Sequence, residues 1–366
     1  MVIITAVTWT SDGAGAARAE GDHPPLPKAE LHLHIEGTLE PELALRLAER
    51  NHVNLPYADA AALRREYSFT NLQSFLNLYY ATTAVLRTEE DFADLARAYL
   101  IRAREQGVRH AEIFFDPQVH AERGVPLERV VDGLWSVLAT SERDHGVSTL
   151  LIMCLLRDRG PEAAMATLLG ALPHRERIVA VGLDSAEVGH PPSAFVQVFD
   201  RARSEGMRCV AHAGEEGPPS YVWEALDLLH VDRIDHGVRS MEDPRLVARL
   251  RDDRVPLTVC PLSNVRLRVV DSIQDHCLPA MIEAGLMVTV NSDDPAYFGG
   301  YVDDNYRLVE RDLGLGQAQL VKLAENSFDA AFLGVEQRER CLRELRESVE
   351  AHASGVTAKP DRPARV

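Results

Sequence analysis

Basic side chains, cysteine pairs and long apolar runs are all scarce in this sequence. Asp and Glu outnumber Lys and Arg by 56 to 39 among 366 residues, which gives a formal net charge of −17. A surface this acidic repels phosphate backbones, so nucleic acid is not an expected partner, whereas a small neutral molecule is compatible with it. No stretch of about 18 uninterrupted apolar residues occurs, which argues against a membrane-spanning helix.

The five cysteines include no Cys-x-x-Cys pair and are odd in number. This usage favours reduced thiols in the cytoplasm over a disulfide framework. The apolar start, MVIITAVTW, lacks the basic segment of a secretion signal. We therefore expect a cytoplasmic protein, for which a homo-oligomer is compatible with the sequence but not specified by it.

Eight short runs of β-branched or apolar residues recur along the chain, and helical patterns fill most of the gaps between them. Strands separated by segments of helix length predict βαβ units and a parallel sheet. Eight such strands predict a closed (β/α)8 TIM barrel rather than an open sheet. The runs are Ala29–Ile35, His110–Asp116, Thr149–Leu156, Ile178–Asp184, Arg208–Gly214, Arg233–Gly237, Pro256–Pro261 and Met287–Asp293.

The expected organisation is a flexible leader over residues 1–26, a single barrel domain over 27–352 and a flexible tail over 353–366. A long helical insertion, about residues 41–106, separates the first strand from the second. Its segment 69–80 is aromatic and amphipathic. This segment either packs against the barrel core or forms a lid over the active face, where long insertions of barrel enzymes lie.

Polar residues at the strand ends carry the expected chemistry. The carboxyl ends of all eight strands meet on one face of a barrel, so residues distant in sequence converge there. The alternation of side chains along a strand directs both histidines of His32-Leu33-His34 into the barrel. Other strands end in such residues as well, namely His212 and Glu215, Asp235 and His236, and Asp293 and Asp294.

Three histidines and a carboxylate suit zinc, which would make hydroxide available at neutral pH by lowering the pKa of a bound water from about 15.7 toward 7. Iron or manganese could occupy the same ligands. Each element also has a purely structural interpretation, since Asp293 and Asp294 before a proline could cap a turn and His236 could be a core histidine. The coincidence of four strands with such ends favours the metal site.

The blocks PKAELHLHIEGTLEPE, AHAGEEGP, RIDHGVR, VCPLSNVRL and VNSDDPAYFGGY resemble the adenosine/adenine deaminase branch of the amidohydrolase superfamily. The resemblance extends from about residue 27 to 332 and implies a (β/α)8 barrel with one Zn2+ per subunit. It implies further that His32, His34, His212 and Asp293 bind the zinc ion.

The resemblance also implies a role for each remaining residue in the removal of the exocyclic amino group of a purine. Glu215 would protonate N1, His236 would position and deprotonate the zinc-bound water, and Asp294 would hydrogen-bond N7. Attack at C6 moves electron density onto N1, and a positioned acid typically contributes about 10²–10⁴-fold to such a step. A pocket shielded from water would keep Glu215 protonated.

The choice of purine depends on two glutamates. Nucleoside deaminases of the resembled family usually carry Asp, which contacts the ribose, where this chain has Glu36. The segment from Gly182 to Pro192 resembles the subgroup that deaminates free adenine. There Glu187 would project into the space of a sugar and accept a hydrogen bond from N9–H, with Ser185 as a weaker candidate for N3 or N9. Alternatively, Glu187 is an exposed loop residue.

Several alternatives remain open at this stage. The substrate could be adenosine, an N6-substituted adenine such as a cytokinin, or aminodeoxyfutalosine. A phosphoesterase or cyclic amidase could use the same scaffold, but such enzymes commonly hold two metals bridged by a carboxylated lysine, and no lysine ends a predicted strand. A binding protein without activity would be expected to lack some of these residues. The H-x-E…P-C-x-x-C pattern of other zinc deaminases is incomplete, because Ser263 stands where a cysteine is required.

Overall fold

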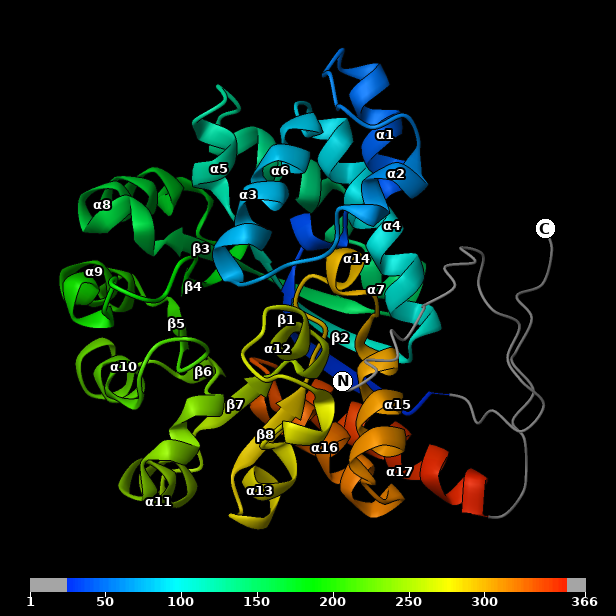
Figure 1. Ribbon diagram of the computed structural model, residues 1–366, viewed down its shortest axis with the longest axis vertical. Helices are drawn as coiled ribbons and strands as arrows, with labels where there is room; N and C mark the ends of the chain where they lie inside the picture. The colour runs from blue at the N-terminus through cyan, green and yellow to red at the C-terminus, as the bar shows by residue number, and fades with distance from the viewer. Residues whose placement is uncertain (1–24, 354–366) are drawn as a thin grey trace, which may run out of the picture.

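The computed structural model describes residues 25–353 and shows strands at the centre surrounded by helices (Figure 1). The expected leader and tail, residues 1–26 and 353–366, lie outside the described residues except for positions 25, 26 and 353. Position 353 is the last residue of a helix.

Eight parallel strands pair in sequential order, as a (β/α)8 barrel requires. The predicted strands are confirmed, and their ends differ by at most three residues. The strands are β1 (Lys28–His34), β2 (Val108–Phe115), β3 (Ser148–Leu156), β4 (Ile178–Asp184), β5 (Arg208–Ala213), β6 (Arg233–His236), β7 (Pro256–Val259) and β8 (Met287–Val290).

The barrel closes between the end of β8 and β1. The His34 amide donates to the Asp293 carbonyl at 3.1 Å, and the Asp293 amide donates to the His32 carbonyl at 3.0 Å. The segments that carry three of the four expected metal ligands, His32, His34 and Asp293, are therefore joined by backbone hydrogen bonds.

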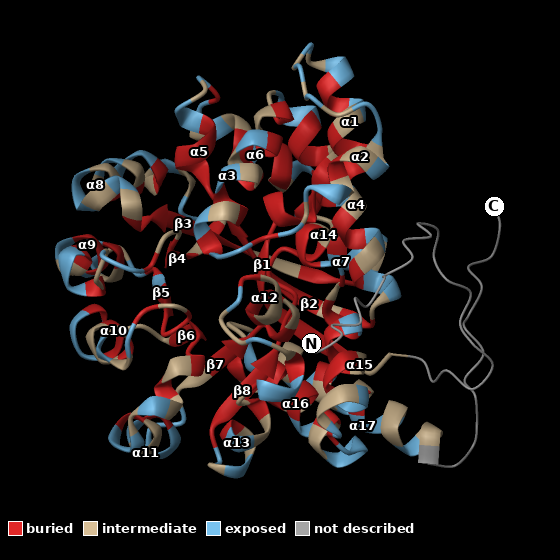
Figure 2. Ribbon diagram, in the orientation of Figure 1, coloured by how far each residue is buried: buried red, intermediate tan, exposed pale blue. Residues whose placement is uncertain are grey.

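Helices surround the strands, with buried residues on their inner sides and exposed residues outside (Figure 2). They are α1 (Pro41–Arg50), α2 (Ala60–Arg65), α3 (Leu72–Thr82), α4 (Glu89–Glu105), α5 (Pro117–Ala121), α6 (Leu127–Leu138), α7 (Ser141–His145), α8 (Gly160–Ala171), α9 (Val196–Ser204), α10 (Pro219–Glu224), α11 (Pro244–Asp252), α12 (Pro261–Arg266), α13 (Leu278–Glu283), α14 (Pro295–Phe298), α15 (Val302–Leu313), α16 (Gln317–Ala330) and α17 (Val335–Ala353). The shorter helices are η1 (Glu36–Thr38), η2 (Thr83–Val85), η3 (Arg157–Arg159), η4 (Leu172–His174), η5 (Pro192–Phe195), η6 (Ala225–Leu229, a π-helix), η7 (Val238–Glu242) and η8 (Ile273–Asp275).

The long insertion after β1 consists of the separate helices α1, α2, α3 and α4. The aromatic segment forms α3, which begins at a capping box of Asn71 and Ser74. Phe75 and Tyr79 of α3 pack on Tyr297 and Phe298 of α14, in a cluster separate from the main barrel core. Because α14 directly follows Asp294, this cluster places α3 next to the residues at the end of β8.

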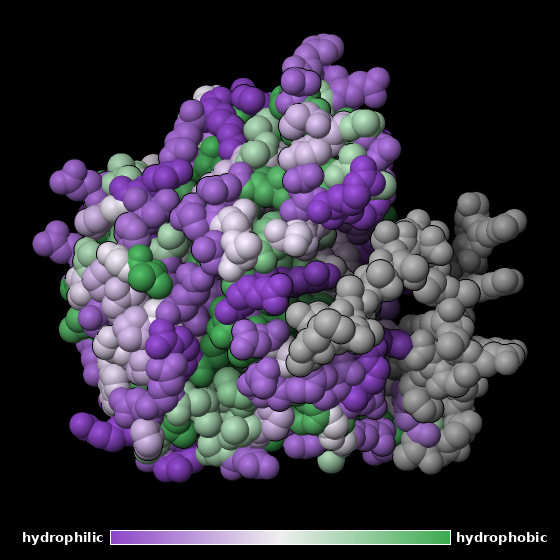
Figure 3. All heavy atoms as spheres, in the orientation of Figure 1, coloured by the Kyte–Doolittle hydropathy of each residue, from purple (hydrophilic) through white to green (hydrophobic). Residues whose placement is uncertain are grey.

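No helix in the described residues is long and apolar enough to cross a membrane. All five cysteines lie in the described part of the chain and are free thiols. The face seen in Figure 3 is largely hydrophilic, with hydrophobic side chains gathered in smaller patches.

Candidate active site

Four side chains that the sequence nominated as metal ligands converge at the carboxyl ends of the strands. The Nε2 atoms of His34 and His212 lie 3.2 Å apart. Asp293 Oδ1 lies 3.4 Å from His32 Nε2 and 3.7 Å from His34 Nε2. Four ligands about 2.0–2.1 Å from a tetrahedral ion lie about 3.3 Å from one another, so these separations suit zinc.

The neighbours of the rings direct their Nε2 lone pairs toward this point. Nδ1 of His212 lies 3.1 Å from the Leu183 carbonyl, which can only accept, so Nδ1 carries the proton and Nε2 the lone pair. Nδ1 of His32 lies 3.0 Å from Thr258 Oγ1, whose hydroxyl donates to Asp235 at 2.8 Å. Partners of this kind fix the tautomer of metal-binding histidines.

One buried ring nitrogen at the centre of the cluster lacks a hydrogen-bond partner within the described part of the chain. His32 Nε2 is buried and has no hydrogen-bond partner among the described residues. Burial holds the pKa of His212 well below its ordinary value, and burial also lowers that of His34. His34 Nε2 faces the His212 lone pair at 3.2 Å, and with its proton on Nδ1 the neutral His34 ring offers a second lone pair to a shared cation. The residues present therefore fit a divalent metal ion.

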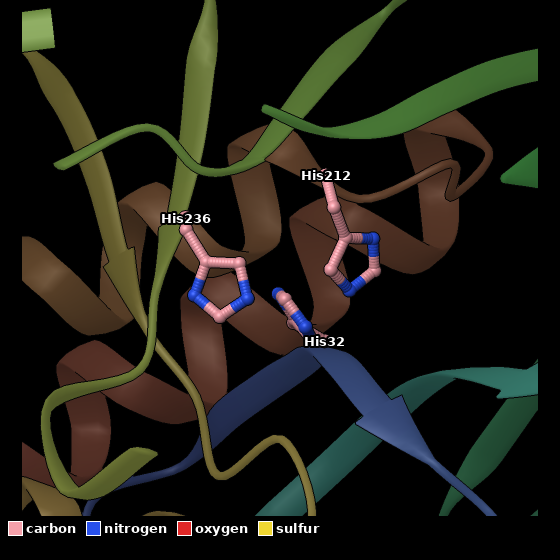
Figure 4. A group of neighbouring side chains, drawn as sticks. All are labelled: His32, His212 and His236. Carbon is pink, nitrogen blue, oxygen red and sulfur yellow. The ribbon is translucent and has the colours of Figure 1, made fainter. Parts of the chain in front are cut away.

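His236 lies beside this cluster. In Figure 4 the rings of His32, His212 and His236 turn toward one another from β1, β5 and the end of β6. Nε2 of His236 is 3.7 Å from both Asp293 Oδ2 and Glu215 Oε2. Burial is the main cause that lowers the pKa of His236 to about 3, so the ring is neutral and can accept a proton.

The backbone is unusual at three of these strand ends. Ser185, His236 and Asp293 have φ values of 72°, 64° and 65°. A left-handed conformation in a residue other than glycine typically costs about 1–3 kcal/mol, and such residues cluster at functional sites because the surrounding structure fixes them. Ser185 directly follows β4, His236 is the last residue of β6, and Asp293 lies three residues after the end of β8.

Glu215 and Asp294 are the two carboxyl groups expected to act on the purine, and both line one cavity with His34, His212 and Asp293. Burial raises the pKa of each well above its ordinary value, and the negative charge of Asp293 adds to the effect. Asp294 Oδ1 is buried without a hydrogen-bond partner among the described residues. Both groups are therefore available in protonated form to a bound molecule.

The cavity has further polar residues that the sequence reasoning did not assign. Asp116 and Asp184, the residues at the ends of β2 and β4, line it, and each has a buried Oδ1 without a partner in the described structure. Burial raises the pKa of both, that of Asp116 to about 7. Their position at strand ends was the signal that could have nominated them.

Helix α3 supplies much of the remaining lining, through Leu72, Phe75, Leu76, Tyr79 and Tyr80. The Tyr80 hydroxyl lies 3.0 Å from Ser185 Oγ, so a hydrogen bond joins α3 to the loop after β4. Of the two interpretations of this segment, a cover over the active face therefore describes its position better than packing on the barrel core does.

The two glutamates that were expected to select the purine do not line the cavity. Glu36 Oε1 accepts from His120 Nε2 at 2.8 Å and from the Asp116 amide at 3.2 Å, so this carboxylate is turned away from the cavity. Glu187 is fully buried, and four backbone N–H groups of the 214–217 loop donate to it. This corrects the alternative in which Glu187 is an exposed loop residue, and its carboxylate is occupied by these amides.

Comparisons with known proteins agree with this architecture. Residues 27–348 match the family described as adenosine deaminase. An adenine deaminase of Streptomyces coelicolor is 66% identical over 323 residues, which are 88% of this chain and 95% of the relative.

Solved structures give the same result. An adenine deaminase from Arthrobacter aurescens is 57% identical, with a TM-score of 0.88 that covers 89% of this chain and 100% of that one. An amidohydrolase from Burkholderia ambifaria, solved with bound Zn, is 28% identical, with a TM-score of 0.83 over 90% of this chain and 93% of the other. The chain belongs to the adenosine deaminase family.

Proposed function

We propose that this protein hydrolyses adenine to hypoxanthine and ammonia, as expected of an enzyme of purine salvage. The observation that carries the proposal is the convergence of Glu215, His236 and Asp294 on the cavity that the metal cluster also lines. The 66% identity to an adenine deaminase supports the same substrate.

His32, His34, His212 and Asp293 would hold one divalent ion per subunit, for which zinc is the best match to imidazole and carboxylate ligands. The Zn-bound amidohydrolase of 28% identity supports this choice. When bound, zinc supplies Lewis-acid activation of a water molecule at neutral pH.

The protein's own residues perform the proton transfers. The neutral His236 ring takes a proton from the attacking water, because its Nε2 lies at the edge of the metal cluster. The protonated Glu215 carboxyl gives its proton to N1 as C6 is attacked. Asp294, whose pKa burial also raises, donates a hydrogen bond to N7, which is an acceptor. His236 then returns its proton to the amino group, which leaves as ammonia, and the C6 hydroxyl gives its proton to the Glu215 carboxylate, which restores the conjugated ring and the starting state of both residues.

The free base suits the cavity better than a nucleoside does. A purine that turns C6, N1 and N7 toward His236, Glu215 and Asp294, respectively, directs its N3–N9 edge to the rest of the lining. Tyr80 and Ser185, which a hydrogen bond joins, belong to that lining, and we propose that they face N9, where a sugar would have to separate them. Adenosine and aminodeoxyfutalosine, which carry a sugar on N9, are therefore expected to be poor substrates.

The test is a panel of adenine, adenosine, isopentenyladenine and aminodeoxyfutalosine, with ammonia release measured on protein of known metal content. We expect kcat/KM to be highest for adenine. A higher value for any other member of the panel would refute the proposed substrate, and metal-loaded protein inactive on all four would refute the reaction.

A further inference from the structure

The Glu187 carboxylate binds four successive backbone amides. Its Oε1 accepts from the Gly214 amide at 2.7 Å, and its Oε2 accepts from the amides of Glu215, Glu216 and Gly217 at 3.1, 2.9 and 2.7 Å. Hydrogen bonds to an ionised acceptor are stronger than those between neutral groups. One side chain from the loop after β4 therefore fixes the whole turn that follows β5.

The glycines at both ends of this turn allow the close approach. Gly214 has a φ of 71°, which a residue with a side chain rarely adopts. A Cβ atom on Gly217 would lie 2.5 Å from Glu187 Oε1, too close for any real contact. The block Gly-Glu-Glu-Gly thus has the residue types that a bound carboxylate requires.

The Glu215 side chain depends on this turn for its position. Among the described residues, no group forms a hydrogen bond with the Glu215 carboxyl, and the Nε2 atom of the neutral His236 ring lies 3.7 Å from it. The backbone therefore determines where the carboxyl lies in the cavity. A misplacement of about 1 Å at a catalytic group can cost about 10²-fold in rate.

A buried guanidinium holds the same segment from its other side. Arg157 Nη1 donates to the His212 carbonyl at 2.7 Å, and its Nε donates to the His190 carbonyl at 2.8 Å. His212 lies in β5, two residues before the turn, and His190 belongs to the loop of Glu187. The two loops are therefore tied together both by Arg157 and by Glu187.

We infer that Glu187 is a positioning residue that holds the proton donor Glu215 in place, and that it makes no contact with the substrate. The inference rests on the proposed function, in which Glu215 protonates N1. It replaces the direct contact with N9–H that the sequence suggested. It also accounts for a buried acid that does not line the cavity.

The test is Glu187→Gln, in which an NH2 group replaces one acceptor oxygen and faces the amides. We expect kcat for adenine to fall by about 10- to 100-fold, with zinc content as in the unaltered protein. The inhibition constant of 1-deazaadenine should be unchanged, because this analogue lacks N1 but keeps N3 and N9–H. The matched control is Glu224→Gln, whose carboxylate accepts only the Ser193 amide at 3.0 Å and lies on α10; it should leave kcat unchanged.

The readouts separate the competing roles of Glu187. If Glu187 bound N9–H, Glu187→Gln would weaken the binding of 1-deazaadenine by the same factor by which it lowers kcat/KM for adenine. This result would show that the inference is wrong. If Glu187→Gln lost its zinc as well as its activity, Glu187 would be a residue that maintains the fold of the whole site, and this result too would overturn the inference.

A second variant decides the matter if Glu187→Gln does not fold. Gly217→Ala keeps the charge but drives the carboxylate from the amides, so it should lower kcat in the same way with 1-deazaadenine binding intact. Unchanged kcat in Gly217→Ala would overturn the inference. An unaltered protein that releases no ammonia from adenine would instead refute the proposed function before any variant is compared.

Discussion

Gly37 lies directly against Asp294. A Cβ atom built on Gly37 would stand 2.1 Å from Asp294 Oδ1 and 2.7 Å from its Cα. Gly37 belongs to η1, just after the two histidines of β1, whereas Asp294 follows β8. The absence of a side chain at position 37 therefore creates the space that Asp294 occupies beside the cavity.

Gly37→Ala is expected to displace Asp294 and to lower kcat/KM for adenine by about 10²-fold, as misplacement of a contacting group does. The clash includes the Asp294 Cα, a backbone atom that cannot move aside as the end of a flexible side chain would. Steady-state kinetics and zinc content are the measurements, and the zinc content should be preserved. Gly170→Ala is the control, because a Cβ there meets nothing within 4 Å. Equal kinetics for both variants would show that Asp294 tolerates the displacement.

Glu215→Gln is expected to retain zinc and to lower kcat by about 10²–10⁴-fold, because an amide cannot supply a proton to N1. Burial raises the pKa of Glu215 well above its ordinary value, so the unaltered enzyme keeps the proton to higher pH than an exposed glutamate would and loses activity as the pH rises through that raised pKa. The pH profile of kcat/KM and the metal content check both points. Activity near the original level in Glu215→Gln would assign the proton donor elsewhere.

The strand pattern predicted that the four residues nominated as metal ligands would converge, because this convergence follows from the topology of the barrel. His32, His34, His212 and Asp293 all lie at or within three residues of strand ends, and a parallel barrel brings such ends together whatever its loops do. Asp116 and Asp184 satisfy the same condition and were overlooked, since an aspartate that ends a strand may equally cap a turn.

Glu36 and Glu187 could not be placed in the same way. Glu36 begins the short helix η1 and Glu187 lies in the loop after β4, where side-chain direction follows from local turns rather than from the two-residue alternation of a strand. Their partners, His120 and the 214–217 amides, come from other βα units. A sequence pattern shows that a loop contains an acid but does not show which neighbouring loop binds it.

Thr258→Val is expected to weaken zinc binding by about 10- to 100-fold, as is usual when the partner of a metal-binding histidine is removed. The valine has the shape of threonine but cannot accept the His32 Nδ1–H, so the tautomer of His32 is no longer fixed. Competition with a chelator measures the zinc affinity. Thr167→Val on α8, where the hydroxyl donates only to the Ala163 carbonyl, is the control. An unchanged affinity in Thr258→Val would remove Thr258 from the support of the site.

Removal of the Tyr80–Ser185 hydrogen bond is expected to relax selection against substituents on N9. In the double variant Tyr80→Phe, Ser185→Ala, neither hydroxyl remains, so α3 is no longer joined to the loop after β4 at this point. The preference for adenine over 9-methyladenine, measured as a ratio of kcat/KM values, should fall by about tenfold. A change of this size is within the range of discrimination that one added carbon atom produces in a binding pocket. Zinc content should not change, because neither residue contacts the metal cluster. If the ratio stays constant, the cavity excludes N9 substituents through its apolar lining, and Phe75 and Leu267 become the residues to alter next.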